Sequence, residues 1–165
     1  MKSLFLSVLG LLLFVAPAQA QQAPDFTLRN LENQEVSLSE LRGKVVLINF
    51  WATWCGPCQV EMPHLQRMHE ELGEQGLTIL AISVDEARTS SRVKPHIKSK
   101  GFTFPVLMDT NTEVVTQYNP QKTLPYTVLV DREGSIVWRH SGYSPGDEVT
   151  LEARPKSSSD NPKTR

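Results

Sequence analysis

A largely apolar run, Val45–Trp51, leads into the only two cysteines of the 165-residue chain, Cys55 and Cys58. An apolar run bounded by turn signals is typical of a buried strand, and Pro57 suits the first turn of a following helix. The two thiols are therefore predicted to lie where a strand meets a helix N-terminus. Unpaired N–H groups and the positive end of the helix dipole favour an anion there, so the first cysteine should form its thiolate more readily than a free thiol. A thiolate beside a second thiol can attack a disulfide and then be released by its neighbour.

Strand and helix patterns continue on both sides of this junction. Alternating segments at 26–29 and 35–38 flank a polar turn and predict an N-terminal hairpin. The further elements expected are a helical turn at 39–41, strands at 44–51, 77–84, 104–108, 126–130 and 135–140, and helices from 56 to Gly73 or Gly76, at 90–100, at 111–118 and at 145–153. Strand–helix–strand order implies a parallel pair, and the last two strands form a hairpin. We therefore expect an α/β fold, with a central mixed sheet flanked by helices and an N-terminal hairpin extension.

The first residues have the pattern of a secretory signal peptide. Lys2 precedes an apolar run at 4–16, and small residues, Ala18 and Ala20, stand at minus three and minus one of a cut after Ala20. A membrane anchor formed by residues 4–16 is the alternative, although this run is shorter than the roughly 20 residues that a spanning helix needs. The sequence therefore predicts a signal peptide at 1–20 and export to a periplasmic compartment.

The remainder divides into a domain and a tail. Residues 21–153 have the length of one domain. Residues 154–165 carry four basic side chains and one acidic one among Ser and Pro, which predicts a disordered basic tail. The formal net charge of −1 lacks the excess of positive charge that is typical of nucleic-acid-binding proteins. We expect a monomer that does not bind nucleic acid.

Two motifs resemble a known family. The stretch Trp54–Cys58, preceded by Asn49–Thr53, is similar to the active site of the thioredoxin superfamily. Glu61–Pro63 and the earlier Pro24–Phe26 resemble its exported TlpA/ResA-type thiol-disulfide oxidoreductases, and the similarity runs roughly from Ala23 to Gly142. This resemblance implies a thioredoxin fold without a cofactor. It also implies a redox-active disulfide, for which we expect Cys55 as the nucleophile and Cys58 as the resolving thiol.

The family also suggests how substrate is held. Pro125, in Thr123–Thr127, matches a loop that holds a cis proline facing the disulfide, and the residue before it, Leu124, would offer backbone hydrogen bonds to an extended substrate. The alternative is an ordinary trans proline at the start of a strand. Trp54, next to Cys55, is expected to form part of the docking surface.

Glu61 is the candidate for proton transfer. It lies three residues after Cys58, hence on the same helix face. We expect it to help move the proton of Cys58, a role that the TlpA/ResA branch assigns to its matching glutamate. Thioredoxin uses a buried aspartate at the position held here by Asn49, so that route is closed. The alternative is that Glu61 is only a favourable charge in the first helical turn.

Metal binding fits the two cysteines less well. Zinc needs two further ligands, and the spacing of His64 and His69 departs from that of zinc fingers. Soft thiolates suit Cu(I), with Met62 and His140 as helpers. The copper carriers of this superfamily have three residues between their cysteines, whereas this chain has two. We therefore predict no metal site.

Two further alternatives concern the cysteines themselves. A structural disulfide across two residues would constrain the unfolded chain little. Related peroxidases place a threonine three residues before a cysteine, whereas Thr53 stands two before Cys55.

The direction of exchange follows from the residues between the cysteines. Gly56 and Pro57 are the pair found in the reducing thioredoxin, at about −270 mV, against about −120 mV for the strongly oxidising periplasmic enzyme. We therefore predict a reductase of disulfides in exported proteins, by resemblance including apocytochrome c, fed by a membrane-embedded electron donor. A disulfide oxidant or isomerase and a copper-binding carrier are the alternatives.

Overall fold

The computed structural model describes residues 21–159, with side chains as far as Lys156. It contains a seven-stranded mixed sheet of order β2-β1-β5-β4-β3-β6-β7. The strands are β1 (Thr27–Asn30), β2 (Glu35–Ser37), β3 (Val45–Trp51), β4 (Leu77–Ser83), β5 (Val106–Met108), β6 (Tyr126–Val130) and β7 (Ile136–Ser141). The helices are η1 (Leu38–Leu41), α1 (Gly56–Leu72), η2 (Ser90–Arg92), α2 (Val93–Lys100), α3 (Glu113–Tyr118) and α4 (Asp147–Ser159). The predicted signal peptide lies outside the described residues, as do residues 160–165 of the predicted tail.

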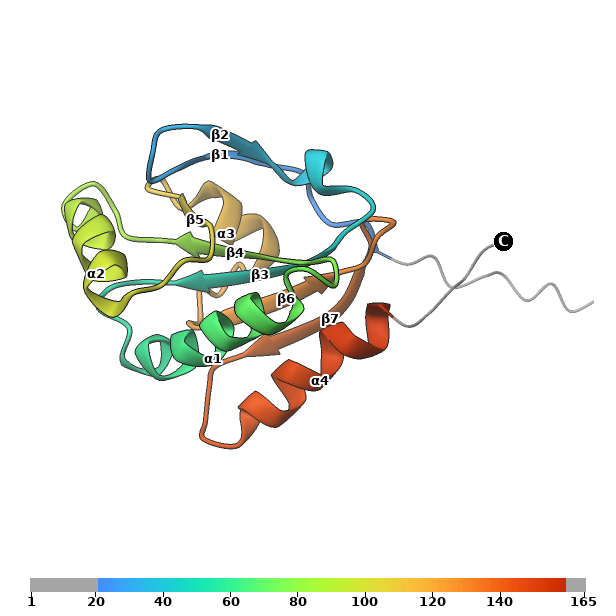
Figure 1. Cartoon of the computed structure of the whole chain (residues 1–165). Coiled ribbons are helices and arrows are strands. Elements are labelled where there is room, and N and C mark those ends of the chain that lie inside the picture. The colour runs from blue at the N-terminus through green and yellow to red at the C-terminus, as the bar shows by residue number, and fades with distance from the viewer. Residues whose placement is uncertain (1–20, 160–165) are drawn as a thin grey trace, which may run out of the picture.

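Strand β3 is the centre of the sheet. Every residue from Val45 to Trp51 is buried, as the apolar run predicted. The strand pairs in parallel with β4 and antiparallel with β6. Both of its faces are covered, since α1 and α4 lie on one side and α3 on the other (Figure 1). Because β3 is held on both edges and both faces, the position of its last residue, Trp51, is fixed. The segment with the two cysteines follows that residue.

The N-terminal hairpin is confirmed. Strands β1 and β2 pair antiparallel, and β1 also pairs antiparallel with β5. The hairpin therefore extends the sheet on the side away from β7. The C-terminal hairpin of β6 and β7 forms the other edge, so the expected mixed sheet is confirmed at both ends.

Helix α1 begins at the cysteine motif. Cys55 is its N-cap, Pro57 lies in its first turn, and the helix is continuous through Pro63 to Leu72. Its buried side chains recur every three or four residues: Cys58, Glu61, Met62, Leu65, Met68 and Leu72. Val60 on the same helix lies outside this buried face and is 52% exposed.

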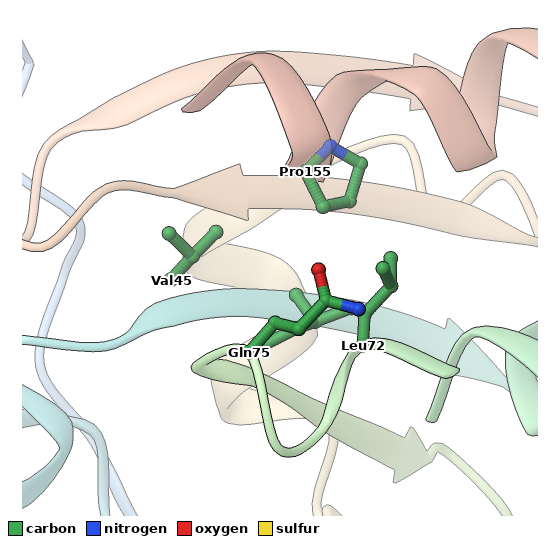
Figure 2. A pocket seen from close by; sticks show the side chains of 5 residues that line it. Val45, Leu72, Gln75 and Pro155 are labelled. Atoms are coloured by element: carbon green, nitrogen blue, oxygen red, sulfur yellow. The ribbon is translucent and has the colours of Figure 1, made fainter. Parts of the chain in front are cut away.

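Helix α4 is longer than the sequence predicted. It runs to Ser159, so the predicted end at Ala153 was wrong, and the first part of the expected tail is helical. Leu151 and Pro155 on this helix are buried. Figure 2 shows Pro155 on α4 above Val45 and Leu72, at a small pocket that these residues line with two others. Apolar contacts with α1 and β3 therefore outweigh the hydrogen bond that a proline removes from a helix.

Helix α2 stands at one end of the sheet. Figure 1 places it beyond the ends of β3 and β4, the end where α1 also begins. The ring of His96 on α2 lies 5.7 Å from the ring of Trp51, the last residue of β3. This contact holds α2 beside the segment that carries the cysteines. In the part of the chain described, no helix combines the length and the apolar character that a membrane span requires.

Candidate active site

A disulfide joins Cys55 and Cys58 at the start of α1. The backbone turns sharply between β3 and α1, where the amide of Cys55 donates to the carbonyl of Ala52 at 3.1 Å. The amide of Cys58 then donates to the sulfur of Cys55 at 3.3 Å. This hydrogen bond and the helix dipole both stabilise negative charge on that sulfur. The junction can therefore hold a thiolate at Cys55 once the disulfide is reduced.

The two sulfurs differ in their surroundings. Cys55 is 6% exposed and lies beside Trp54, whose side chain is 62% exposed. Cys58 is fully buried at 0%. Of the two residues, only Cys55 therefore retains any exposed surface. This asymmetry agrees with the expected order of attack by Cys55 and release by Cys58.

The Leu124–Pro125 peptide bond is cis, so the alternative of a trans proline was wrong. The next residue, Tyr126, pairs with Phe50 across β6 and β3, which brings Pro125 to the end of the sheet from which the cysteine segment leaves. Within residues 21–159, neither the amide nor the carbonyl of Leu124 forms a hydrogen bond. These two groups are available to a chain laid alongside them, and the binding of a substrate segment by Leu124 stays a prediction.

Glu61 is almost completely buried, with 1% of its surface exposed. Its carboxylate accepts hydrogen bonds from the side-chain amide of Asn49 at 2.7 Å and the hydroxyl of Thr127 at 3.2 Å. The Asn49 amide also donates to the Thr127 hydroxyl at 2.9 Å, so the three side chains close a triangle between β3, β6 and α1. Helix α1 has no acidic residue in its first turn. The alternative of a first-turn charge for Glu61 was therefore wrong.

Burial controls the protonation of Glu61. Removal from water raises the pKa of Glu61 from 4.5 to about 7, and the negative charge of Asp147 also raises it. The hydrogen bonds from Asn49 and Thr127 act in the opposite direction, because they stabilise the carboxylate. A group with this pKa can accept or release a proton near neutral pH. It lies on the same face of α1 as Cys58, so its position suits proton exchange with the buried thiol.

Thr127 was missed from the sequence. It lies two residues after Pro125 and pairs with Asn49 across β6 and β3. In strands, residues two apart point to the same face, so a polar residue at this position of an apolar strand was the available signal.

A second buried carboxylate, Asp85, was also missed. It is fully buried and lies two residues after Ser83, the last residue of β4. It accepts hydrogen bonds from the Thr53 amide at 2.8 Å, the Thr53 hydroxyl at 2.6 Å and the Ser83 hydroxyl at 3.0 Å. These bonds fix the segment that immediately precedes Trp54 and Cys55. The only sequence signal was an acidic residue at the end of an apolar strand.

The residues weighed as metal ligands are occupied elsewhere. Met62 is fully buried, and His140 lies 3.2 Å from a carboxylate oxygen of Asp147. His64 contacts Arg67 at 3.0 Å, and the ring of His69 meets Phe104 edge to face. Residues 21–159 contain no group of three or more His, Cys, Asp or Glu side chains placed to hold a metal ion.

The fold and the site define a class of protein. A mixed sheet, a redox disulfide at a helix N-terminus and a cis proline at the same end of the sheet are the features of a thioredoxin-fold thiol-disulfide oxidoreductase. Residues 20–139 match the model of the AhpC/TSA family, and the chain belongs to that family.

Two curated relatives with the same name are similar to this chain over most of its length. The chain is 38% identical over 122 residues to "Thiol-disulfide oxidoreductase ResA" of Halalkalibacterium halodurans, covering 74% of this chain and 68% of that protein. It is 37% identical over 120 residues to the protein of the same name from Bacillus subtilis, covering 73% and 65%. A solved thiol:disulfide interchange protein of the thioredoxin family from Chlorobium tepidum is 26% identical, with a TM-score of 0.75 over 87% of this chain and 99% of that one. The protein is a thiol-disulfide oxidoreductase with the thioredoxin fold.

Thr53, the threonine weighed for the peroxidase alternative, is hydrogen-bonded to Asp85 and not to Cys55. The hydroxyl of Thr53 donates to Asp85, and Cys55 is bonded to Cys58. The observed contacts therefore describe an anchored loop that presents a disulfide.

Proposed function

We propose that this protein is an exported reductase of protein disulfides, with Cys55 as the nucleophile and Cys58 as the resolving thiol. The observation that carries this proposal is the disulfide at the N-terminus of α1, in which Cys55 retains a small exposed surface and Cys58 has none. Gly56 and Pro57 between them favour the reducing direction, as in thioredoxin.

In the first step, the Cys55 thiolate attacks one sulfur of a substrate disulfide. A bond forms between Cys55 and that sulfur while the substrate S–S bond breaks, and the other substrate sulfur leaves as a thiolate. The Cys58 amide and the helix dipole stabilise the attacking thiolate. The product of this step is a mixed disulfide.

In the second step, Glu61 accepts the proton of the Cys58 thiol. The new thiolate attacks the sulfur of Cys55, the mixed disulfide breaks, and the second substrate thiolate leaves. The substrate gains two electrons and becomes a dithiol, while the protein becomes the disulfide seen here. Burial places the pKa of Glu61 at about 7, so its ionised form is available at neutral pH to take this proton.

Trp54, Leu124 and Pro125 hold the substrate in this proposal. The exposed indole of Trp54 borders Cys55 and offers apolar contact area. The open backbone groups of Leu124 bind an extended segment beside the substrate cysteine. This mode recognises the backbone near a disulfide and therefore accepts substrates of different sequence.

The cellular setting completes the proposal. The pattern at residues 1–20 supports export to the periplasm with cleavage after Ala20, and a membrane-embedded donor would return electrons to the disulfide. Apocytochrome c, with its haem-attachment cysteines, is one candidate substrate. Other exported disulfide proteins are equally compatible with backbone recognition.

Trapping of mixed disulfides tests this function. Reduced Cys58→Ser protein should form a stable mixed disulfide with a peptide that contains one disulfide, because no thiol remains to release it. Cys55→Ser protein is the matched control and should form none at Cys58, which is buried. A mixed disulfide at Cys58, or none with either variant, would contradict the proposed roles.

The reduction potential tests the direction. Equilibration of the Cys55–Cys58 pair against glutathione should give a value nearer the thioredoxin value of about −270 mV than about −120 mV. A value near the oxidising end would replace the reductase with an oxidant or isomerase. Titration of the reduced protein with Cu(I) tests the copper alternative, and sub-stoichiometric binding is expected.

A further inference from the structure

A hollow of about 260 Å³ lies beside the exposed Trp54. Val84, Glu86, Arg88 and Thr89 line it together with Trp54. Trp54 precedes Cys55 directly, so the hollow is lined by the residue next in sequence to the one that carries the proposed nucleophile. A partner that docks at Cys55 would therefore place neighbouring side chains over it.

The walls of this hollow are held by hydrogen bonds. The amide and the hydroxyl of Thr53 donate hydrogen bonds to the buried Asp85. These bonds join the segment before Trp54 to the segment before Glu86. The amides of Thr89 and Ser90 donate to the carbonyl of Glu86 at 2.8 Å and 2.9 Å. The hollow is thus formed before a partner arrives, which lowers the entropic cost of binding.

Positive charge is concentrated on the segment that continues from this wall. Residues 87–100 contain five basic side chains and no acidic one, although the whole chain carries a net charge of −1. All five are exposed: Arg88, Arg92, Lys94, Lys98 and Lys100. The contact between His96 and Trp51 holds this segment at the active-site end of the sheet, as Figure 1 shows for α2.

The helix dipole of α2 favours only some of these basic residues. Lys98 and Lys100 lie in the last turn of α2, where the helix dipole favours cations. Arg92 and Lys94 lie at the opposite end, where the dipole disfavours them. Lys94 reaches the carbonyl of Leu31 at 3.0 Å. In the part of the chain described, Arg88 and Arg92 form no side-chain hydrogen bond or ion pair.

We propose that Arg88 and Arg92, with the hollow beside Trp54, form a docking surface for protein disulfides flanked by an acidic segment. This rests on the proposed thiol exchange at Cys55 and specifies the chemistry of its partners. Guanidinium groups pair with carboxylates through two parallel hydrogen bonds, and neither arginine has such a partner within the described chain. Charge pairs at the rim of an interface act mainly on the association rate and weaken with salt. The surface therefore selects partners at the encounter step.

Two peptides test this surface. Each contains the same single disulfide, followed in one peptide by three glutamates and in the other by three lysines. With reduced wild-type protein at low salt, we expect the acidic peptide to be reduced on the order of tenfold faster, and we expect the preference to fall as salt is raised. The double variant Arg88→Ser/Arg92→Ser should reduce both peptides at similar rates.

Lys44→Ser is the matched control. Lys44 is exposed but precedes β3, at the end of the sheet away from the cysteines. It should keep the preference for the acidic peptide. Equal rates for the two peptides with wild-type protein, or the same loss of preference in Lys44→Ser as in the double variant, would overturn the docking surface while leaving thiol exchange intact. Failure to reduce either peptide would overturn the proposed function, and the docking surface with it.

Discussion

Two buried carboxylates flank the cysteine segment, and they are held in different ways. Asp85 accepts hydrogen bonds from one backbone amide and two hydroxyls, all from residues beside its own strand end or the loop before Cys55. Glu61 accepts from one amide side chain and one hydroxyl. For Glu61 the cost of burial exceeds the stabilisation by these donors, so its pKa rises to about 7. The comparison teaches that burial alone does not define a role: Asp85 anchors the loop before Cys55, whereas Glu61 has a pKa raised into the neutral range.

The largest expected effect comes from removing the anchor. Asp85→Ala leaves the Thr53 amide and two hydroxyls without their acceptor, and we expect a loss of about 4 kcal/mol in unfolding free energy. Chemical denaturation of the oxidised protein measures it. Asp85→Asn keeps one acceptor oxygen and should lose less. A loss below about 1 kcal/mol for the alanine variant would lie within the range of ordinary surface substitutions. It would show that Asp85 does not anchor the loop before Cys55.

The next effect is a pH dependence of stability due to Glu61. Its folded pKa of about 7 lies above the ordinary glutamate pKa of 4.5, so its favourable contribution to stability is complete below pH 4.5 and is lost as pH rises through 7. Between these limits wild type should lose on the order of 3 kcal/mol relative to Glu61→Gln. Denaturation curves from pH 4 to 8 measure this difference.

Glu71→Gln provides the control for that measurement, because Glu71 is an exposed residue of the same helix. Its stability curve should run parallel to that of wild type. A Glu61→Gln curve that also stays parallel would show that Glu61 does not titrate in this range.

Removing the Thr127 hydroxyl that donates to Glu61 should have a smaller effect on stability. Thr127→Val deletes a donor to the carboxylate and keeps the shape of the side chain. Because this donor stabilises the charged form, the pKa of Glu61 should rise further, on the order of one unit. The midpoint of the stability curve should move to higher pH. An unchanged midpoint, or one at lower pH, would contradict the assigned direction.

The smallest effect is expected from the matching change at Asp85. Ser83→Ala removes one of the hydroxyls that donate to this carboxylate, while both donors from Thr53 remain. We expect a loss of about 1 kcal/mol and no shift of the Glu61 midpoint. A shift of the midpoint would mean that the two carboxylates are coupled and cannot be treated as separate.

Local patterns account for the features that could be predicted. The apolar run of β3, Pro57 in the first turn and the paired hairpin segments each depend on neighbouring residues, and each prediction was confirmed. Resemblance to known proteins added the cis bond before Pro125, which no local pattern specifies.

The remainder depends on contacts between distant residues. Thr127 and Asn49 meet only because β6 pairs with β3, and Asp85 reaches Thr53 only because β4 ends beside the cysteine segment. Helix α4 extends past its predicted end because Pro155 gains a buried position, although proline alone argues against a helix. Such contacts are decided by the packed sheet rather than by the local sequence.

The release step gives the most direct test of proton transfer to Glu61. Reduced protein mixed with a chromophoric aromatic disulfide releases one chromophore when Cys55 attacks and a second when Cys58 resolves the mixed disulfide. In wild type, the second rate should rise with pH to a plateau, with a midpoint near the Glu61 pKa of about 7. In Glu61→Gln it should fall on the order of 100-fold and lose that midpoint, while the first rate is retained. A second rate and midpoint that are the same in Glu61→Gln as in wild type would contradict the role of Glu61.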